Sequence, residues 1–204
     1  MSDTDDNLLG WRRLPDFEGE HVRLRALRRD DLEALLDAFS DGLEDVFTTV
    51  VPTPATISGW FDNLKREREA GRCFPYAVLD SAGRVSGTTR YLRMSPAHRR
   101  LEIGGTIYAG RVQRTGLNTE AKLFLLRHAF ETLGCNVVQL RTDWLNVRSR
   151  AAIERLGAKM DGVLRGHLVM PDGHIRDSVV YSIVMSEWPG VRSNLLAMMR
   201  RGRA

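Results

Sequence analysis

The sequence predicts one domain of mixed α/β fold, in which a mostly antiparallel central sheet is flanked by helices. Three observations carry this prediction. The chain has 204 residues, of which 43% are hydrophobic and 27% are charged, and this balance is typical of a single globular domain. Strand-like runs between residues 74 and 109 are separated by short turns, which favours an antiparallel meander. Segments with helical periodicity precede and follow that meander.

The expected elements follow from local signals in chain order. Alternation of apolar and polar residues predicts strands, stripes of apolar residues predict helices, and turn residues separate them. We treat residues 1–16 as an N-terminal arm and residues 17–204 as the single domain. The elements expected are a strand at 22–26, helices at 30–39 and 53–71, strands at 74–79, 85–92 and 100–109, a helix at 119–133, a strand at 137–142, a helix at 146–156, strands at 162–170 and 177–185, and a terminal helix.

Composition excludes several classes of protein. No apolar run approaches the roughly 20 residues of a membrane span, and the acidic Met1–Asp6 segment is unlike a signal peptide. We therefore expect a cytoplasmic protein without a membrane partner. The net charge of +4 and the pI of about 9.4 would suit nucleic acid, but the arginines are scattered and many lie beside acidic residues, so we expect no specific nucleic-acid partner. Cys73 and Cys135 are isolated thiols that indicate neither a zinc site nor a disulfide.

The segment Gln113–Ala121 is a short polar turn that contains a glycine and precedes a strongly helical run. If the helix begins at Thr119 or its neighbour, the unpaired N–H groups of its first turn point into the loop, and the helix dipole adds partial positive charge there. Such a site binds anions such as a pyrophosphate. The alternative is an ordinary turn in which Asn118 or Thr119 caps the helix.

Several motifs in order resemble the GNAT superfamily of acyl-CoA N-acyltransferases, and specifically its RimJ/RimL-like branch of ribosomal-protein N-terminal acetyltransferases. The family's pyrophosphate motif is similar to Gln113-x-x-Gly116-x-Asn118. Asn146-x-x-Ser149 with the following Glu154–Ala158 segment is similar to its second motif, and Asp172-Gly173 with Glu187-Trp188 matches the C-terminal signature of the branch. The order of elements matches over nearly the whole chain.

The resemblance implies the GNAT fold and acetyl-CoA as acyl-donor substrate, with no metal. It implies that the third meander strand and the next strand splay apart, near Ile107-Tyr108 and Val138–Leu140, and that the pantetheine arm of the cofactor lies in the gap. The implied acyl-CoA-binding residues are Ile107, Gln113, Arg114, Thr115, Gly116, Leu117, Asn118, Thr119, Asn146 and Ser149. For the Arg114 side chain the alternative to a phosphate contact is a solvent-facing arginine.

Two residues are candidates for the chemistry. Glu102 lies on the strand where GNAT enzymes often carry a glutamate that draws a proton from the amine, and a carboxylate within reach is what a general base requires. The alternative is a structural glutamate paired with Arg99, Arg100 or an arginine across the sheet. Ser149 stands where the ribosomal branch has its proposed proton donor, although helix capping explains it equally well.

One departure from the family is chemically important. The tyrosine that many GNAT enzymes use as general acid, seven residues after the motif asparagine, is replaced by Ile153, which removes the usual proton donor. Asn118 also replaces the last Gly or Ala of the pyrophosphate motif. Asn146 is expected to orient the cofactor, and N-capping is its alternative role.

The sequence therefore predicts an acetyl-CoA-dependent N-acyltransferase that moves an acetyl group to a primary amine by direct attack on the thioester. The acceptor is either a protein N-terminus or a small-molecule amine, and a homodimer is compatible with these features. Two alternatives remain: another donor such as succinyl-CoA, or a non-catalytic GNAT-like binding module. We expect the loop at residues 46–52, the two early helices and the final hairpin to form the acceptor pocket.

Overall fold

The computed structural model describes residues 10–43 and 48–201, and these form an eight-stranded sheet with the order β1-β2-β3-β4-β5-β6-β8-β7. Every neighbouring pair is antiparallel except β5 and β6, which are parallel. The predicted mixed α/β fold is confirmed. The strands are β1 (Phe17–Glu18), β2 (Val22–Ala26), β3 (Phe74–Asp80), β4 (Val85–Ser95), β5 (Arg100–Tyr108), β6 (Val137–Asp143), β7 (Lys159–Val169) and β8 (Ile175–Val184).

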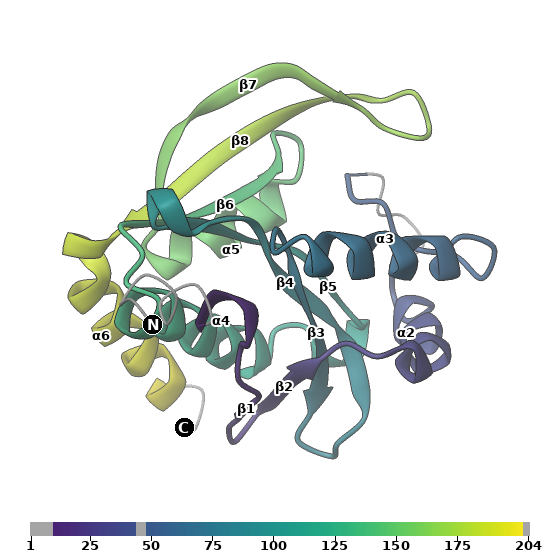
Figure 1. The fold of residues 1–204 in the computed structure, drawn as a ribbon, viewed down its shortest axis with the longest axis horizontal. Coiled ribbons are helices and arrows are strands. Elements are labelled where there is room, and N and C mark those ends of the chain that lie inside the picture. The colour runs from purple at the N-terminus through teal and green to yellow at the C-terminus, as the bar shows by residue number, and fades with distance from the viewer. Residues whose placement is uncertain (1–9, 44–47, 202–204) are drawn as a thin grey trace.

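Helices lie on both faces of this sheet (Figure 1). The α-helices are α2 (Leu32–Phe39), α3 (Ile57–Glu69), α4 (Leu117–Arg127), α5 (Val147–Leu156) and α6 (Trp188–Arg201); the shorter helical segments are η1 (Arg29–Asp31), η2 (Pro96–His98), η3 (Gly110–Val112), η4 (His128–Thr132) and η5 (Met185–Glu187). Apolar side chains of α4, α5 and α6 join a large core on one face. Those of α2 and α3 form a smaller core on the other.

Successive side chains of a strand point to opposite faces of the sheet, so the face of each residue follows from its position in the strand. In β5, Leu101 and Ile103 point into the larger core. Glu102, between them, therefore points to the face that α2 and α3 cover further along the sheet. The same alternation in β6 sends Val138 and Leu140 into the larger core and Arg141 to the face shared with Glu102.

The helix after the predicted pyrophosphate-binding turn at residues 113–119, called the cradle below, differs from the prediction at both ends. It begins at Leu117, two residues before Thr119, because glycine is a favourable N-cap and Gly116 fills that position. Its last turns form the π-helical segment η4, which the 3.6-residue periodicity of the sequence did not indicate. Gly134 follows the helix with a φ of +63°, the left-handed conformation that glycine commonly adopts after a helix C-terminus.

Two further boundaries differ from the predictions. Helix α3 begins at Ile57, because residues 54–56 form a turn in which the Thr53 N–H donates to Thr56 Oγ1 at 2.9 Å. In the β7–β8 hairpin, β7 begins at Lys159, three residues earlier than expected, and β8 begins at Ile175, two residues earlier; the hairpin extends well beyond the helices (Figure 1).

The predicted N-terminal arm lies partly outside the described residues, which begin at residue 10. Within the described part, Trp11 and Leu14 are buried in the larger core. The boundary after residue 16 stays a prediction. Residues 46 and 47 of the expected acceptor loop also lie outside the described residues. No described helix has both the length and the apolar character needed to cross a bilayer.

Candidate active site

The central feature of the site is the separation of β5 from β6. The two strands pair only from Arg100 to Glu102 against Val137 to Gln139. Beyond these residues β5 stays paired with β4 as far as Tyr108, while β6 pairs with β8. The predicted splay is therefore present, with one correction: Val138 is still paired with Leu101, so the strands part beyond Gln139. Ile107 lies on the stretch of β5 that pairs with β4 but no longer with β6.

The predicted cradle lies at the N-terminus of α4. Its backbone turns sharply, since Arg114 has a φ of +62°. The Thr115 hydroxyl donates to the Val112 carbonyl at 2.7 Å and accepts from the Leu117 N–H at 3.2 Å. The N–H groups of Asn118 and Thr119 have no acceptor among the described residues. These donors are available to an anion at the positive end of the helix.

The other side chains of the cradle have distinct tasks. The amide nitrogen of Gln113 donates to the Tyr108 carbonyl at 2.9 Å, and its oxygen accepts from Arg148 at the start of α5. Gln113 thus joins the end of β5 to the helix that follows β6. The exposed Arg114 side chain makes no polar contact with the described residues. A Cβ on Gly116 would meet the His21 ring at 2.7 Å, so this glycine allows the β1–β2 turn to approach α4.

Asn146 and Ser149 lie at the N-terminus of α5. Asn146 Oδ1 accepts from the Ser149 N–H at 2.9 Å, and its amide nitrogen donates to Thr48 Oγ1 at 2.8 Å. The alternative role of Asn146, N-capping, is therefore present, and the same side chain holds the loop before α3 through Thr48. The Ser149 hydroxyl is half-buried and has no partner among the described residues. Ile153 is buried in the larger core, so no proton donor stands in place of the family tyrosine.

Glu102 is held between two arginines. Its side chain is buried, Arg93 Nη1 of β4 lies 2.7 Å from Oε2, and Arg141 Nε of β6 lies 3.1 Å from the same oxygen. The Arg141 contact is an ion pair without hydrogen-bond alignment. The partner is thus an arginine from each neighbouring strand, rather than Arg99 or Arg100. Any amine that reaches this carboxylate has to compete with both guanidinium groups.

Two further carboxylates organise the site, and no pattern in the sequence predicted either of them. Glu120 accepts from the N–H groups of Glu20, His21 and Val22 at 3.1, 2.6 and 3.0 Å, which fixes the start of α4 to the sheet. Asp143 is buried at the end of β6 and contacts the ring of His174. Within the described part of the chain, no group of three His, Cys, Asp or Glu side chains could hold a metal ion.

Comparison with known proteins gives this geometry its context. Residues 21–159 match the family model described as an acetyltransferase (GNAT) domain. The chain belongs to the GNAT acetyltransferase family. It is 33% identical over 176 residues to the Bacillus subtilis (strain 168) protein named "Putative ribosomal N-acetyltransferase YdaF", and the match covers 84% of this chain and 95% of that protein.

Solved structures agree with this assignment. A GCN5-related N-acetyltransferase from Brucella melitensis superposes with a TM-score of 0.80 at 29% identity, covering 91% of this chain and 85% of that one. The fold is also that of Mycobacterium smegmatis RimJ in complex with CoA-disulfide, with a TM-score of 0.73, 24% identity and coverage of 87% and 88%. The predicted family and fold are confirmed: the enzyme is an N-acetyltransferase of the GNAT family, whose members use acetyl-CoA to acetylate amines.

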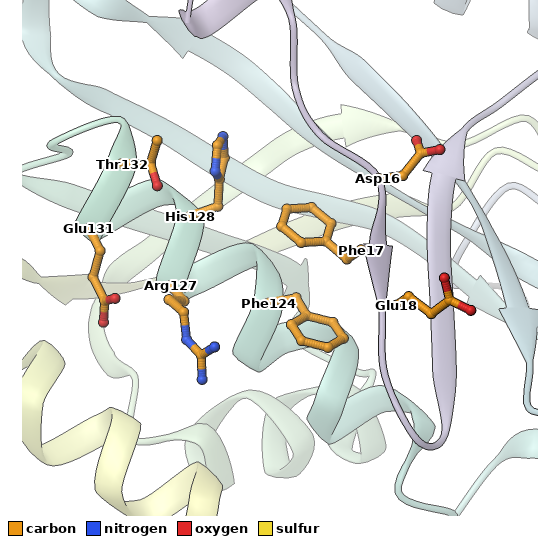
Figure 2. A pocket seen from close by; sticks show the side chains of 8 residues that line it. All are labelled: Asp16, Phe17, Glu18, Phe124, Arg127, His128, Glu131 and Thr132. Atoms are coloured by element: carbon orange, nitrogen blue, oxygen red, sulfur yellow. The ribbon is translucent and has the colours of Figure 1, made fainter.

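The enzyme has another hollow on the sheet face that α4 covers. Phe17 of β1 stacks on Phe124 of α4 with ring centroids 5.6 Å apart, and His128 meets the edge of the Phe17 ring (Figure 2). Burial lowers the pKa of His128. None of the predicted site residues lines this hollow, so we assign no part of the acetyl transfer to it.

Proposed function

We propose that the enzyme binds acetyl-CoA with its pyrophosphate on the first turn of α4 and its pantetheine arm between β5 and β6. The observation that carries the proposal is that the N–H groups of Asn118 and Thr119 have no acceptor in the described part of the chain, close to the end of the β5 stretch that has parted from β6. The complex of M. smegmatis RimJ with CoA-disulfide, a protein of the same fold, supports it. Thr115, Gly116 and Leu117 shape the turn, while Arg114 is free to contact a phosphate.

The residues on the far side of the gap fit the rest of the cofactor. The half-buried Ser149 hydroxyl can donate or accept a hydrogen bond, whereas Asn146 is already engaged by Ser149 and Thr48. We infer that Ser149 contacts the cofactor and that Asn146 holds the α5 terminus in place. Gln113 keeps the two sides of the gap at a fixed separation through Tyr108 and Arg148.

Bound acetyl-CoA supplies the thioester that donates the acetyl group. The acceptor amine must be deprotonated before it attacks, and Glu102 is the buried carboxylate beside the parting strands. Arg93 and Arg141 hold this carboxylate in one orientation, so an amine would exchange for one of them as it enters. A thiolate is a good leaving group, hence the lack of a tyrosine at position 153 costs little. Acyl transfer of this kind requires no metal.

For the acceptor, we propose the α-amine of a protein N-terminus, with a small-molecule amine as the alternative. The name of the B. subtilis relative, a ribosomal N-acetyltransferase, supports the first. A ribosomal acceptor would imply action in the cytoplasm. The acceptor would approach on the face of the sheet that carries Glu102 and is bordered by α3.

The test combines binding with turnover. Calorimetry with acetyl-CoA should give saturable binding that weakens as salt rises, because the pyrophosphate contact is electrostatic. A panel of peptides and small amines is then assayed for release of free CoA thiol. Absence of acetyl-CoA binding would overturn the cofactor assignment, and turnover of small amines alone would overturn the protein acceptor.

A further inference from the structure

A cavity of about 390 Å³ lies between α3, the segment that leads from α3 into β3, and strand β4. Its lining contains the guanidinium groups of Arg72, Arg90 and Arg93, but Glu67 is its one acidic residue. Arg93 also pairs with Glu102 at 2.7 Å. The cavity therefore adjoins the carboxylate that we assign to the acceptor amine.

The three arginines differ in their partners. Arg72 forms a bidentate salt bridge with Glu67 at 2.7 and 3.0 Å, and Arg93 forms a salt bridge with Glu102. Arg90 has no hydrogen-bond or ion-pair partner among the described residues, and its Nε is fully buried. Burial lowers the pKa of this guanidinium, and the nearby Cys73 and Glu102 groups offset only part of that effect. A buried guanidinium without a partner is costly in a folded protein.

The backbone makes room for Arg90. Strand β5 carries two consecutive glycines opposite it, and Gly105 has a φ of +54°, which favours glycine. A Cβ at Gly105 would lie 2.1 Å from Arg90 Nε and 2.5 Å from Cζ. The guanidinium thus lies directly against β5 in the stretch where this strand has parted from β6.

The register places Arg90 close to the reacting groups. Arg90 is opposite Gly104, and Leu92 is opposite Glu102. Arg90 and Leu92 are two residues apart and share a face, which corresponds to roughly 7 Å along the strand. The charge of Glu102 acts on the Arg90 guanidinium, so the two side chains are near enough for one small acceptor to place its carboxylate on Arg90 and its amine at Glu102.

We propose that Arg90 binds a carboxylate of the acceptor, so that the enzyme selects amines that carry a carboxylate a few bonds away. The planar fork of a guanidinium matches a carboxylate through two parallel hydrogen bonds. The acceptor would supply the anionic partner that the protein withholds from Arg90. This inference rests on the proposed function, since it names the class of amine used at the same site.

The test compares acceptors that differ only in one charge. One pair is a free amino acid and its amide, and the other is two otherwise identical peptide amides with Asp or Asn at the second position. We expect kcat/KM to be about tenfold or more higher for the carboxylate member of at least one pair. A preference within the peptide pair indicates a polypeptide acceptor, whereas a preference within the amino-acid pair indicates a small molecule.

Arg90→Met should bring the ratio of kcat/KM between the two members of a pair close to one, because methionine keeps much of the side-chain bulk but lacks the guanidinium group. Arg66→Met is the matched control. Arg66 is an exposed arginine of α3, the helix that borders the cavity, but its side chain does not line the cavity. This control should keep the preference. Arg90→Lys should keep part of it, since an ammonium is a point charge that makes no bidentate contact.

A second measurement does not depend on turnover. Calorimetry of the N-acetylated products with the CoA-bound enzyme should show tighter binding of the carboxylate member, and Arg90→Met should bind both members alike. Equal affinity in the unaltered enzyme, or an undiminished preference in Arg90→Met, overturns the role of Arg90. Failure to bind acetyl-CoA would instead refute the proposed function, so the two failures are distinguishable.

Discussion

His174 Nε2 lies 2.9 Å from Asp143 Oδ2, so the turn of the β7–β8 hairpin is tied to the end of β6. The Asp143 side chain is only 1% exposed, and its other oxygen accepts from the Leu145 N–H at 2.8 Å. A buried carboxylate depends on each of its donors more than an exposed one does. The contact therefore stabilises the hairpin that borders the acceptor face.

We expect His174→Gln to preserve both stability and turnover, because a glutamine amide can donate to Asp143 as the ring does. Its kcat should stay within about threefold of the unaltered enzyme, whereas Asp143→Ala should cost about 1–3 kcal/mol of unfolding free energy. Thermal denaturation and steady-state kinetics measure the two effects. A hundredfold loss of kcat in a His174→Gln enzyme of unchanged stability would instead make this pair the proton acceptor.

Asn118→Asp separates cofactor binding from helix stability. A carboxylate in the first turn of α4 favours the helix through its dipole, yet it repels a pyrophosphate on the same N–H groups. We expect the melting temperature to be unchanged or higher and the affinity for CoA to fall about tenfold or more at low salt. The neutral variant Asn118→Ser is the control. Equal CoA affinity in both variants would show that the pyrophosphate does not bind at this turn.

The parts of the fold that sequence predicted are those with local causes. Asn146 caps α5 through the Ser149 N–H three residues later, and Gly157 ends it with a φ of +103°. Both signals lie within the helix and its neighbours. The start of α4 was misplaced because Gly116, Asn118 and Thr119 are all acceptable N-caps, and the choice depends on how Gly116 approaches His21, far away in sequence.

The missing parts of the site are non-local. Glu102 was a candidate from its strand, but its two ion pairs depend on the register of β4 and β6 on either side. Arg90 is one of many arginines in the sequence, and its lack of a partner appears only in the folded chain, where its guanidinium packs against Gly105 of β5. No periodicity in the chain encodes such distances.

Glu102→Gln tests the proton acceptor. We expect kcat to fall about 10²-fold at neutral pH, the scale of a positioned base, with partial recovery at high pH as the free amine becomes abundant. Since the change also removes the negative charge that Arg93 and Arg141 share, thermal stability must be measured on the same enzyme. Full activity at every pH would show that Glu102 is structural.

Ser149→Ala should have a smaller effect than Glu102→Gln. If the hydroxyl contacts the cofactor, the variant should lose the binding free energy of one hydrogen bond, about 0.5–1.5 kcal/mol. The KM for acetyl-CoA should rise accordingly, with little change in kcat. Initial rates at varied acetyl-CoA give both constants. A fall in kcat at unchanged KM would assign Ser149 to proton donation to the leaving thiolate.

Lys122 provides a test of pH dependence. Its ammonium group is buried in α4 and donates to Thr106 Oγ1 at 2.9 Å and Thr89 Oγ1 at 3.3 Å, with no carboxylate partner among the described residues. Burial lowers its pKa to about 7. The unfolded chain, with an ordinary lysine pKa, therefore binds more protons than the folded one above pH 7, so stability gains up to about 1.4 kcal/mol per pH unit as pH rises.

Lys122→Met should lack this gain while keeping the packing of α4 on β4 and β5. The measurement is the unfolding free energy of both enzymes in urea between pH 7 and pH 8.5. Burial raises the pKa of Cys73 to about 11 and that of Cys135 to about 12, which opposes the lysine effect as pH rises, but both thiols are present in each enzyme. The difference between the two profiles therefore reports Lys122 alone. Parallel profiles would show that Lys122 stays charged in the folded enzyme and that the threonine hydroxyls are sufficient to hold its charge.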